Sequence, residues 1–327
     1  MKNQDLQCTV TGGAGFIGSA LVESLLSDGF RVICADNFAT GKHSNIAPFL
    51  KNPDFVLAEG DICDFEFAKK ICTGSQFVFH EAALGSVPRS IQTPQETLRV
   101  NVSGTAAVFK AAAESGVKRL IYASSSSVYG DSQILPKQEN VIGTQLSPYA
   151  LSKYVDELLA AQFSKLYGLQ CIGLRYFNVF GPRQDPQSEY AAVIPKFVQA
   201  LLQKKSPVIY GDGGTTRDFT YVKDVVSANR KAMTADNAAL GGVFNIASEH
   251  EISLNRLFRE LQKCLAEDMP IILSVQPQYA PSRPGDVARS LADISCARKY
   301  LGYTPEFSFE NAIKETCAWY KNNFCKQ

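Results

Sequence analysis

Apolar runs and amphipathic stretches alternate along the first half of the chain. Residues 6–10 form a short apolar run that predicts a buried strand, and residues 18–26 carry apolar side chains at helical spacing. Further strands are predicted at 30–35, 55–59, 77–80, 119–123 and 171–175, and further helices at 65–71, 94–115 and 148–167. Strands that alternate with helices in this way predict an α/β fold built on a doubly wound parallel sheet.

The turn between the first strand and the first helix carries three glycines, Gly12, Gly15 and Gly18. Glycines permit a tight turn and the close approach of a pyrophosphate, and the helix N-terminus offers its free N–H groups to the phosphates. Asp36 ends the second strand, where a carboxylate would bind the adenosine ribose. Together these features predict a Rossmann dinucleotide site. The acid favours NAD over NADP, although Lys42 nearby leaves NADP open.

The pattern loosens after residue 181, where proline and glycine separate shorter elements. Helices are predicted at 191–202, 222–233, 254–265 and 309–322, and strand-like segments at 208–210, 242–246 and 271–275. We therefore interpret residues 1–180 as the dinucleotide-binding domain. Residues 181–327 are interpreted as a smaller mixed α/β domain at the carboxyl edge of the sheet, where ligands bind in open α/β folds. Some segments of this second domain are expected to return to the first.

Composition narrows the class of protein further. The 327 residues are 45% hydrophobic and 20% charged, and 33 basic against 32 acidic side chains give a net charge of +1. This balance argues against nucleic acid or a membrane surface as a partner. Nine cysteines without a C-x-x-C pair and a polar, short N-terminus lead us to expect a reducing cytoplasm. The three histidines show no metal-like spacing, so no metal is expected, and His80 is interpreted as structural.

Two stretches carry candidate catalytic groups. Tyr149 and Lys153 stand four residues apart in a predicted helix, so their side chains share one face. A phenol ordinarily ionises at about pH 10. A neighbouring ammonium favours the phenolate, which can then take a hydroxyl proton while hydride leaves the same carbon. The serines 124–127 follow the strand 119–123 and can hydrogen-bond the same substrate oxygen. Each stretch alone has a structural explanation, a solvated lysine or a polar turn, but their combination with the glycine turn and Asp36 favours catalysis.

Further motifs are Asp36-Asn37, Asp61-Ile62, Val128-Tyr129-Gly130 after the serine run, Arg-Tyr-Phe-Asn-Val-Phe-Gly-Pro at 175–182, Arg217-Asp218-Phe219 and Arg283-Pro284-Gly285-Asp286. With the glycine turn and the Tyr149/Lys153 pair, they resemble the extended short-chain dehydrogenase/reductases, and among these the nucleotide-sugar epimerases. The resemblance covers nearly the whole chain. It implies a permanently bound NAD, a UDP-sugar substrate, and a homodimer in which helices 94–115 and 148–167 of two chains form a four-helix bundle.

The resemblance also implies roles for single residues. Ser125 matches the catalytic serine, Tyr149 the base, and Lys153 its electrostatic partner. The implied cofactor-binding residues are Gly12, Gly15, Phe16, Ile17, Gly18, Asp36, Asn37, Asp61, Ile62, Ala82, Asn101, Tyr149, Lys153 and Tyr176. The implied substrate-binding residues are Gly85, Ser86, Ser125, Ser126, Tyr149, Asn178, Val193, Tyr210, Arg217, Arg283, Asp286 and Ser290. Two arginines that converge on a pyrophosphate make chemical sense.

The implied reaction is inversion at C4 of the sugar. Hydride passes from C4 to NAD+ while Tyr149 takes the O4 proton, the 4-keto sugar rotates, and hydride returns to the opposite face. The related sugar 4,6-dehydratases carry Asp-Glu after the catalytic serine or threonine, and a UDP-xylose-forming decarboxylase carries a glutamate at the second position. Ser126 and Ser127 stand there in this chain, which argues against both reactions.

The substrate is suggested by Ser290, which stands where galactose-type epimerases have a bulky aromatic residue. A serine leaves room for an N-acetyl group at C2 of the sugar, and residues 85–90 and 184–186 also look like bacterial UDP-N-acetylhexosamine 4-epimerases. The prediction is a UDP-GlcNAc/UDP-GalNAc 4-epimerase, with the C6-oxidised acids as additional candidates. Arg89 fits a C6 carboxylate, a phosphate or a surface role equally well.

Three alternatives stay open. The first is a 4-epimerase for UDP-glucuronate or UDP-glucose, and the second is a nucleotide-sugar oxidoreductase, which would consume added NAD(P)H. The third is a non-enzymatic dinucleotide sensor. A sensor has no need of Ser125, Tyr149 and Lys153 together, so their presence argues against it.

Overall fold

A parallel sheet of seven strands forms the centre of the structure, a computed structural model that describes residues 6–187, 191–282 and 288–324. The strand order is β11-β6-β5-β4-β1-β2-β3, and every neighbouring pair is parallel. The strands are β1 (Gln7–Thr11), β2 (Arg31–Asp36), β3 (Phe55–Glu59), β4 (Phe77–His80), β5 (Arg119–Ser125), β6 (Cys171–Tyr176) and β11 (Val243–Ile246). The chain crosses over after β3 from one side of β1 to the other, which confirms the predicted doubly wound fold.

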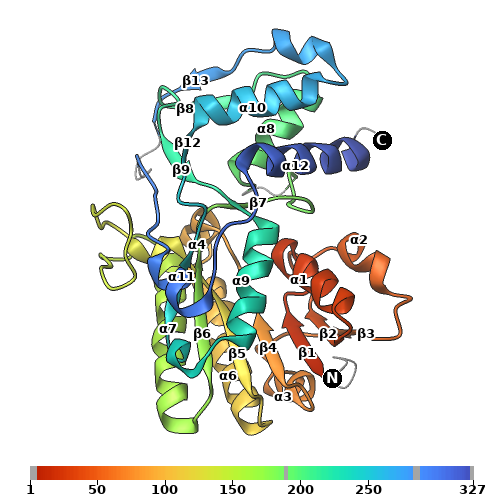
Figure 1. The fold of residues 1–327 in the computed structure, drawn as a ribbon, viewed down its shortest axis with the longest axis vertical. Coiled ribbons are helices and arrows are strands. Elements are labelled where there is room, and N and C mark those ends of the chain that lie inside the picture. Colours follow the sequence, from red (N-terminus) through yellow and green to blue (C-terminus); the bar gives the residue numbers. More distant parts are fainter. Residues whose placement is uncertain (1–5, 188–190, 283–287, 325–327) are drawn as a thin grey trace.

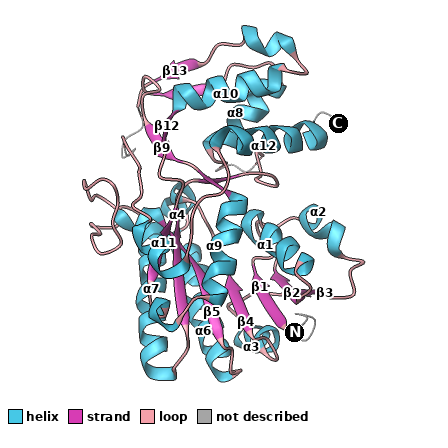
Figure 2. Ribbon diagram, in the orientation of Figure 1, coloured by secondary structure: helices cyan, strands magenta, loops and turns pink. Residues whose placement is uncertain are grey.

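Helices cover both faces of this sheet (Figures 1 and 2). One face packs under α1 (Phe16–Ser27), α9 (Val222–Thr234) and α11 (Ser295–Leu301), whose apolar side chains share a core with β1, β2 and β6. The other face packs under α3 (Phe65–Cys72), α6 (Thr105–Glu114) and α7 (Pro148–Tyr167). Because both faces are covered, the strands read as nearly continuous apolar runs rather than alternating ones.

A second group of elements lies above the sheet in Figure 1. It contains α8 (Val193–Leu202), α10 (Leu254–Ala266) and α12 (Phe309–Phe324), whose apolar side chains form a separate core. Three short strand pairs accompany these helices: β7 (Val179–Phe180) with β10 (Thr220–Tyr221), β8 (Val208–Tyr210) with β13 (Gln278–Ala280), and β9 (Thr216–Asp218) with β12 (Glu251–Ser253). Most of the chain after residue 181 belongs to this group, but α9, β11 and α11 return to the central sheet.

Several elements differ from the expectations. The strand predicted at 271–275 is wrong: Pro270–Ser274 form a 3₁₀-helix, whose end is fixed by the Gln262 amide donating to the carbonyls of Ile272 and Val275. The loop expected after β4 contains the short helix α4 (Val87–Gln92). The single helix predicted at 94–115 is α5 (Pro94–Leu98), a π-helical stretch and then α6.

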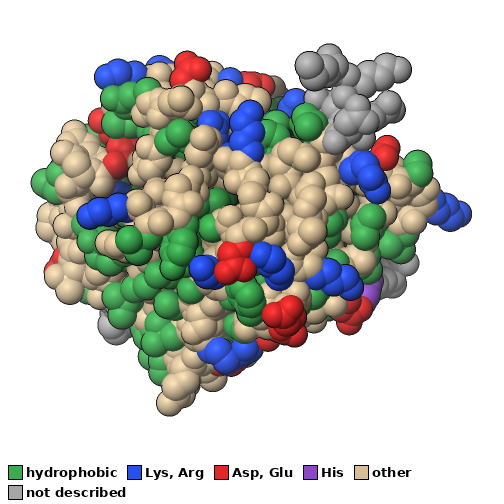
Figure 3. Space-filling view, turned by 90° about the horizontal axis from the view of Figure 1, so that it is seen from below, with side chains coloured by type: hydrophobic (Ala, Val, Ile, Leu, Met, Phe, Trp, Pro, Cys, Tyr) green, Lys and Arg blue, Asp and Glu red, His purple; other side chains and the backbone are tan. Residues whose placement is uncertain are grey.

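The remaining short elements lie in connections. They are α2 (His43–Ile46), the π-helix Arg99–Gly104 and the 3₁₀-helices Ala47–Phe49, Ser126–Tyr129 and Asn237–Ala239. No helix within the described residues has the length and apolar character needed to cross a membrane. Basic and acidic side chains are interspersed on the face shown in Figure 3, which carries no large patch of one sign.

Candidate active site

The glycine turn after β1 has no room for side chains. A Cβ at Gly18 would lie 2.1 Å from the Gly12 carbonyl oxygen, and Gly12 itself has a φ of +67° and abuts the backbone of Ala82. Only glycine fits such contacts. Gly15 is the N-cap of α1, so the first turn of that helix presents its backbone N–H groups beside the turn. The cradle therefore fits a pyrophosphate, as the sequence predicts.

Asp36 ends β2 beside this turn and is nearly buried. Its carboxylate accepts hydrogen bonds from the backbone N–H of Ala14, at 2.9 Å, and of Phe38, at 2.8 Å. Burial raises the pKa of Asp36, and these two bonds oppose that rise. Lys42, which left NADP open, has its Nζ 2.8 Å from Asp185 Oδ2, so its charge is already engaged.

A cavity of about 560 Å³ lies at the carboxyl ends of the strands, in front of the turn. Nearly all predicted cofactor residues line it: Gly12, Gly15, Phe16, Ile17, Gly18, Asp36, Asn37, Asp61, Ile62, Ala82, Tyr149, Lys153 and Tyr176. Gly85, Ser125, Ser126 and Asn178 from the predicted substrate set line it too. Asn101 lies outside the lining, fully buried, and its side chain bonds Leu84 N–H and Ser152 Oγ. Asn101 thus fixes the backbone of Leu84, which lines the cavity.

Helix α7 delivers the two central groups. Ser147 caps its N-terminus by accepting a hydrogen bond from Ala150 N–H at 3.1 Å, Pro148 occupies the first turn, and Gly168 ends the helix with a left-handed backbone. The cap and the stop agree with the sequence prediction. Because the helix starts at this point, Tyr149 and Lys153 both face the cavity from its first two turns.

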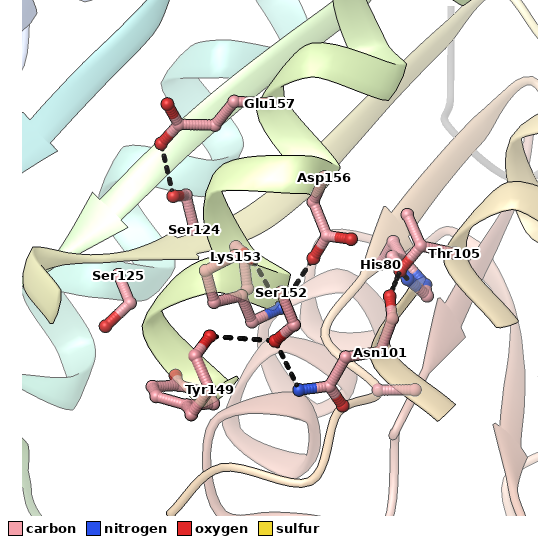
Figure 4. Close-up of polar contacts among 12 residues, drawn as sticks. His80, Asn101, Thr105, Ser124, Ser125, Tyr149, Ser152, Lys153, Asp156 and Glu157 are labelled. Carbon is pink, nitrogen blue, oxygen red and sulfur yellow. Dashed lines mark hydrogen bonds and ion pairs between the residues drawn. The ribbon is translucent and has the colours of Figure 1, made fainter. Parts of the chain in front are cut away.

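Lys153 is held rigidly. Its Nζ donates to the Ala123 carbonyl at 2.9 Å and to Asp156 Oδ2 at 3.2 Å, and the lysine side chain is only 3% exposed (Figure 4). Burial alone would lower the pKa of Lys153, but the negative charges of Asp156, Tyr149 and Glu81 raise it above its usual value. Lys153 is therefore a permanent cation beside Tyr149.

Ser125 stands at the end of β5 and caps the short 3₁₀-helix that follows. Its Oγ accepts hydrogen bonds from Ser127 N–H at 3.1 Å and Ser127 Oγ at 2.9 Å. The two contacts leave the Ser125 hydroxyl proton available to a substrate oxygen. Ser124 instead points behind the sheet end, where it donates to Glu157 at 2.5 Å, and Glu157 forms a buried bidentate pair with Arg175. This network anchors the strand end that carries Ser125.

Two acids of the site, Asp156 and Glu81, were not predicted from the sequence. Glu81 follows β4, lines the cavity, and accepts a hydrogen bond from the Tyr176 hydroxyl at 2.7 Å, while Asn229 donates to that hydroxyl at 2.8 Å. An acid at the carboxyl end of a predicted strand is the signal that could have indicated Glu81. Asp156 could have been found from its position three residues after Lys153, on the same helical face.

His80 belongs to the buried structure behind the cavity. Its two ring nitrogens lie 2.8 Å from Thr11 Oγ1 and 2.9 Å from Thr105 Oγ1. Burial lowers the pKa of His80 to about 3, with the Lys153 charge adding to this effect. The ring is neutral and joins β1, β4 and α6, in line with the structural interpretation.

A second cavity of about 760 Å³ adjoins the first and leads into the upper group of elements. Val193, Tyr210 and Arg217 line it, and Asn178, Val179 and Gln184 line both cavities. Asn178 adopts a positive φ of 35° and donates from its side chain to the Asp218 carbonyl at 3.0 Å. The two adjoining cavities thus bring together eight predicted substrate residues: Gly85, Ser125, Ser126, Tyr149, Asn178, Val193, Tyr210 and Arg217.

Two other predicted substrate residues, Ser86 and Ser290, do not line either cavity. Ser86 caps α4 by accepting from Arg89 N–H at 3.2 Å. Ser290 is half-buried and falls outside the linings of both cavities. Arg283 and Asp286 lie outside the described residues.

The glycine cradle, the acid Asp36 beside it and the Tyr149–Lys153 pair at one cavity define the class of this protein as an NAD-dependent enzyme of the Rossmann type. A model described as the NAD dependent epimerase/dehydratase family matches residues 8–247. The chain therefore belongs to the NAD-dependent epimerase/dehydratase family.

Similar proteins match the chain over almost its whole length. The UDP-glucose 4-epimerase of Mycolicibacterium smegmatis is 35% identical over 319 residues, which cover 97% of this chain and 99% of that protein. A UDP-N-acetylglucosamine 4-epimerase from Methanobrevibacter ruminantium, solved with UDP-N-acetylmuramic acid, is 39% identical with a TM-score of 0.90, covering 99% and 100% of the two chains. The UDP-glucuronic acid 4-epimerase of Bacillus cereus, solved with UDP-glucuronic acid and NAD, is 29% identical with a TM-score of 0.89, covering 98% and 100%.

Proposed function

We propose that this protein inverts C4 of a UDP-N-acetylhexosamine, interconverting UDP-GlcNAc and UDP-GalNAc, and that Ser125, Tyr149 and Lys153 perform the proton chemistry. The observation that carries the proposal is that these three side chains line one cavity together with the cofactor cradle. The adjoining cavity supplies Arg217, a suitable partner for a diphosphate. Three similar proteins are named as 4-epimerases of UDP-sugars, which supports a UDP-sugar as the substrate.

The residues divide the work as follows. Lys153 favours the Tyr149 phenolate, which removes the O4 proton of the sugar and later returns it. Ser125 donates its hydroxyl proton to the same oxygen and so fixes the position of C4. NAD, when bound, accepts the C4 hydride and gives it back, so the reaction needs no net oxidant.

Dehydration and decarboxylation need an additional acid or base beside the catalytic serine. Ser126 and Ser127 stand there, and Ser127 is engaged with Ser125 Oγ. Neither hydroxyl can act as a carboxylate at neutral pH. The site therefore favours plain epimerisation over these two reactions.

The N-acetylated substrate is the finer part of the proposal. It is supported by the small side chain at Ser290 and by the 39% identity to a protein named UDP-N-acetylglucosamine 4-epimerase. The second candidate is a non-acetylated or C6-oxidised UDP-sugar, which the names of the glucose and glucuronic acid enzymes favour.

The decisive experiment is a product assay without added cofactor. Purified protein is incubated separately with UDP-GlcNAc, UDP-GlcNAcA, UDP-Glc and UDP-GlcA, and the C4 epimers are resolved by chromatography. The proposal requires the highest kcat/KM with UDP-GlcNAc and no loss of turnover when NAD is omitted. Activity that appears only with stoichiometric NAD(P)H would identify an oxidoreductase instead.

Ser290→Tyr tests the pocket-volume argument, with Ser290→Ala as its control. The resemblance implies that Ser290 faces the C2 substituent of the sugar. On that premise the tyrosine should lower turnover of UDP-GlcNAc at least tenfold and spare UDP-Glc, because it would fill the space that the N-acetyl group needs. The alanine variant should keep both activities. An equal response of both sugars to the tyrosine rules out this role of Ser290.

We also propose that residues 1–180 form the cofactor-binding domain and that residues 181–327 form the substrate domain, with some segments returning to the first.

We propose that the protein is a homodimer. Three leucines of α7, Leu151, Leu158 and Leu166, are 44%, 50% and 66% exposed and recur at helical spacing, and Ile91 of α4 is 62% exposed. In Figure 3 apolar side chains gather on the left, the side on which α7 lies in Figure 1. A second copy of α7 fits this stripe. Sedimentation of the wild type and of Leu158→Lys measures the oligomeric state. The buried charge in the variant should disrupt the dimer and yield monomers.

A further inference from the structure

Asp156 is a buried acid that the reaction described above does not use. It lies three residues after Lys153 on α7, and its side chain is only 1% exposed. Its Oδ2 accepts from Lys153 Nζ at 3.2 Å. Its other oxygen, Oδ1, is buried beside Thr105, whose hydroxyl lowers the pKa of Asp156, but it forms no hydrogen bond of normal geometry. In Figure 4 Oδ1 points toward Thr105, away from Tyr149. The carboxylate therefore meets the catalytic lysine from the side opposite the phenol.

Such a group is costly to retain for structure alone. A buried carboxylate with one unpaired oxygen loses hydration that its hydrogen bonds do not replace. Its ion-pair partner among the described residues is Lys153, whose other contact is the Ala123 carbonyl. The main consequence of Asp156 is therefore electrostatic and falls on Lys153 and whatever Lys153 acts upon.

Lys153 stands between two anions when Tyr149 is ionised. In a site shielded from water, charges interact more strongly than at the surface, so a negative Asp156 cancels part of the field that Lys153 exerts on the phenol. A phenolate that receives less support forms at higher pH, but it is a stronger base toward a sugar hydroxyl. The charge of Asp156 therefore makes Tyr149 harder to ionise but makes its phenolate a stronger base.

We propose that Asp156 is a positioning residue that sets how strongly Lys153 stabilises the Tyr149 phenolate, and thereby sets the pH range and the base strength of the site. The inference rests on the proposed roles of Tyr149 and Lys153.

Other ionisable groups lie around the pair, and Glu81 also acts on Lys153 through its charge, but among the described residues Asp156 is the acid that forms an ion pair with Lys153. The other groups are Glu157 on α7, Tyr122 on β5, His80 on β4, and Glu81 after β4. Glu157 is bound bidentately by Arg175, His80 is neutral, and Glu81 bonds Tyr176. Burial raises the pKa of Asp156 to about 6, although the Lys153 charge opposes the rise. Asp156 therefore becomes an anion only as the pH rises through about 6.

The test compares Asp156→Asn with the wild type. Asparagine keeps the shape and can still accept from Lys153, but it removes the negative charge. We expect the acid limb of the kcat/KM profile to move to lower pH by about one unit, because Lys153 then acts on the phenol unopposed. The plateau kcat should fall about 3- to 10-fold, because the phenolate is a weaker base.

A second readout does not depend on turnover. The tyrosinate absorbance of the protein is titrated in the near ultraviolet, and the Tyr149→Phe difference isolates the signal of Tyr149. This signal should appear about one pH unit lower in Asp156→Asn. Asp156→Ser, which also removes the charge and leaves room for a water molecule, replaces Asp156→Asn if the amide variant does not fold. Glu114→Gln on α6 is the control, because it removes one exposed carboxylate far from Lys153.

The outcomes distinguish a failure of the proposed role of Asp156 from a failure of the proposed function. A folded Asp156 variant with an unmoved acid limb and an unmoved absorbance titration overturns the inference, as does an equal shift in Glu114→Gln. If Tyr149→Phe keeps full activity, the proposed function itself fails. If Tyr149→Phe is inactive and the Asp156 variants do not shift, only the role of Asp156 is lost.

Discussion

Glu81 shows how one buried carboxyl group makes the stability of the protein depend on pH. Burial raises its pKa to about 7, against the lowering effects of the Tyr176 hydrogen bond and the Lys153 charge. An unfolded glutamate ionises at about pH 4.3. Between these two values the folded protein binds more protons than the unfolded one. The free energy of unfolding is therefore reduced as the pH rises through this interval.

Glu81→Gln should remove that dependence. The amide oxygen can still accept from Tyr176, but the group no longer ionises, so the variant gains stability relative to the wild type as the pH rises from 5 to 8, by roughly 2 kcal/mol. Urea unfolding at pH 5, 6, 7 and 8 measures the difference. A difference that is constant across this range contradicts the assignment of the buried proton to Glu81.

At the residue scale, the sequence predicted those site groups whose chemistry is visible in a local motif. Gly18, Asp36 and Tyr149 were found because their spacing follows from one strand, one turn or one helix. Glu81 and Asp156 were missed because burial and neighbours from other segments give them their properties. No pattern along the chain states that Tyr176 donates to Glu81 across 95 residues.

Helix α7 is the element on which the reaction geometry depends. Its first turn carries Tyr149 and is fixed by the Ser147 cap. Loss of a cap frees an N–H group and lets the first turn fray, typically at a cost of about 1 kcal/mol. The position of Tyr149 is therefore sensitive to a residue that does not touch substrate.

Ser147→Ala should lower both stability and activity, whereas a matched cap should affect stability alone. The matched cap is Ser308, which accepts from Asn311 N–H at the start of α12. Each alanine variant should lose about 1 kcal/mol of unfolding free energy. Only Ser147→Ala should also lower kcat, by about threefold or more, since α7 and not α12 carries Tyr149, the proposed base. Urea unfolding and initial rates on both variants check this, and equal kcat values would contradict it.

At the element scale, the sequence predicted what local signals determine. The N-cap, the proline and the terminal glycine of α7 gave the bounds of that helix. Residues 242–246 had the apolar character of a strand, but their partner, β6, depends on how the chain returns after α9. Residues 271–275 are equally apolar and form a 3₁₀-helix, because packing on α10 and the Gln262 amide override the strand preference.

On the scale of the whole molecule, an ion pair joins two segments that wall the cofactor cavity. Lys42 follows β2 and Asp185 follows β7, and their neighbours Thr40 and Gln184 line the cavity. The two side chains are 40% and 28% exposed, so the pair contributes at most about 1 kcal/mol. A cofactor held between these walls leaves more slowly while the pair is intact.

Asp185→Asn should therefore speed the loss of NAD by up to about fivefold at low ionic strength, and the difference should vanish in high salt. The rate is measured by rapid dilution and separation of free NAD. Glu310→Gln, which breaks a more exposed pair with Arg256, is the control and should leave the rate unchanged. A difference that persists in high salt contradicts an electrostatic origin.

The two cavities share one stretch of chain, which includes Asn178, Val179 and Gln184. Tyr320 of α12 braces this stretch from behind by donating to the Gln184 carbonyl. We therefore expect a ligand that shifts this stretch in one cavity to change the affinity of the other cavity for its own ligand. Thermodynamic reciprocity then links the two affinities. The factor by which a bound sugar nucleotide changes the affinity for NAD equals the factor by which bound NAD changes the affinity for the sugar nucleotide.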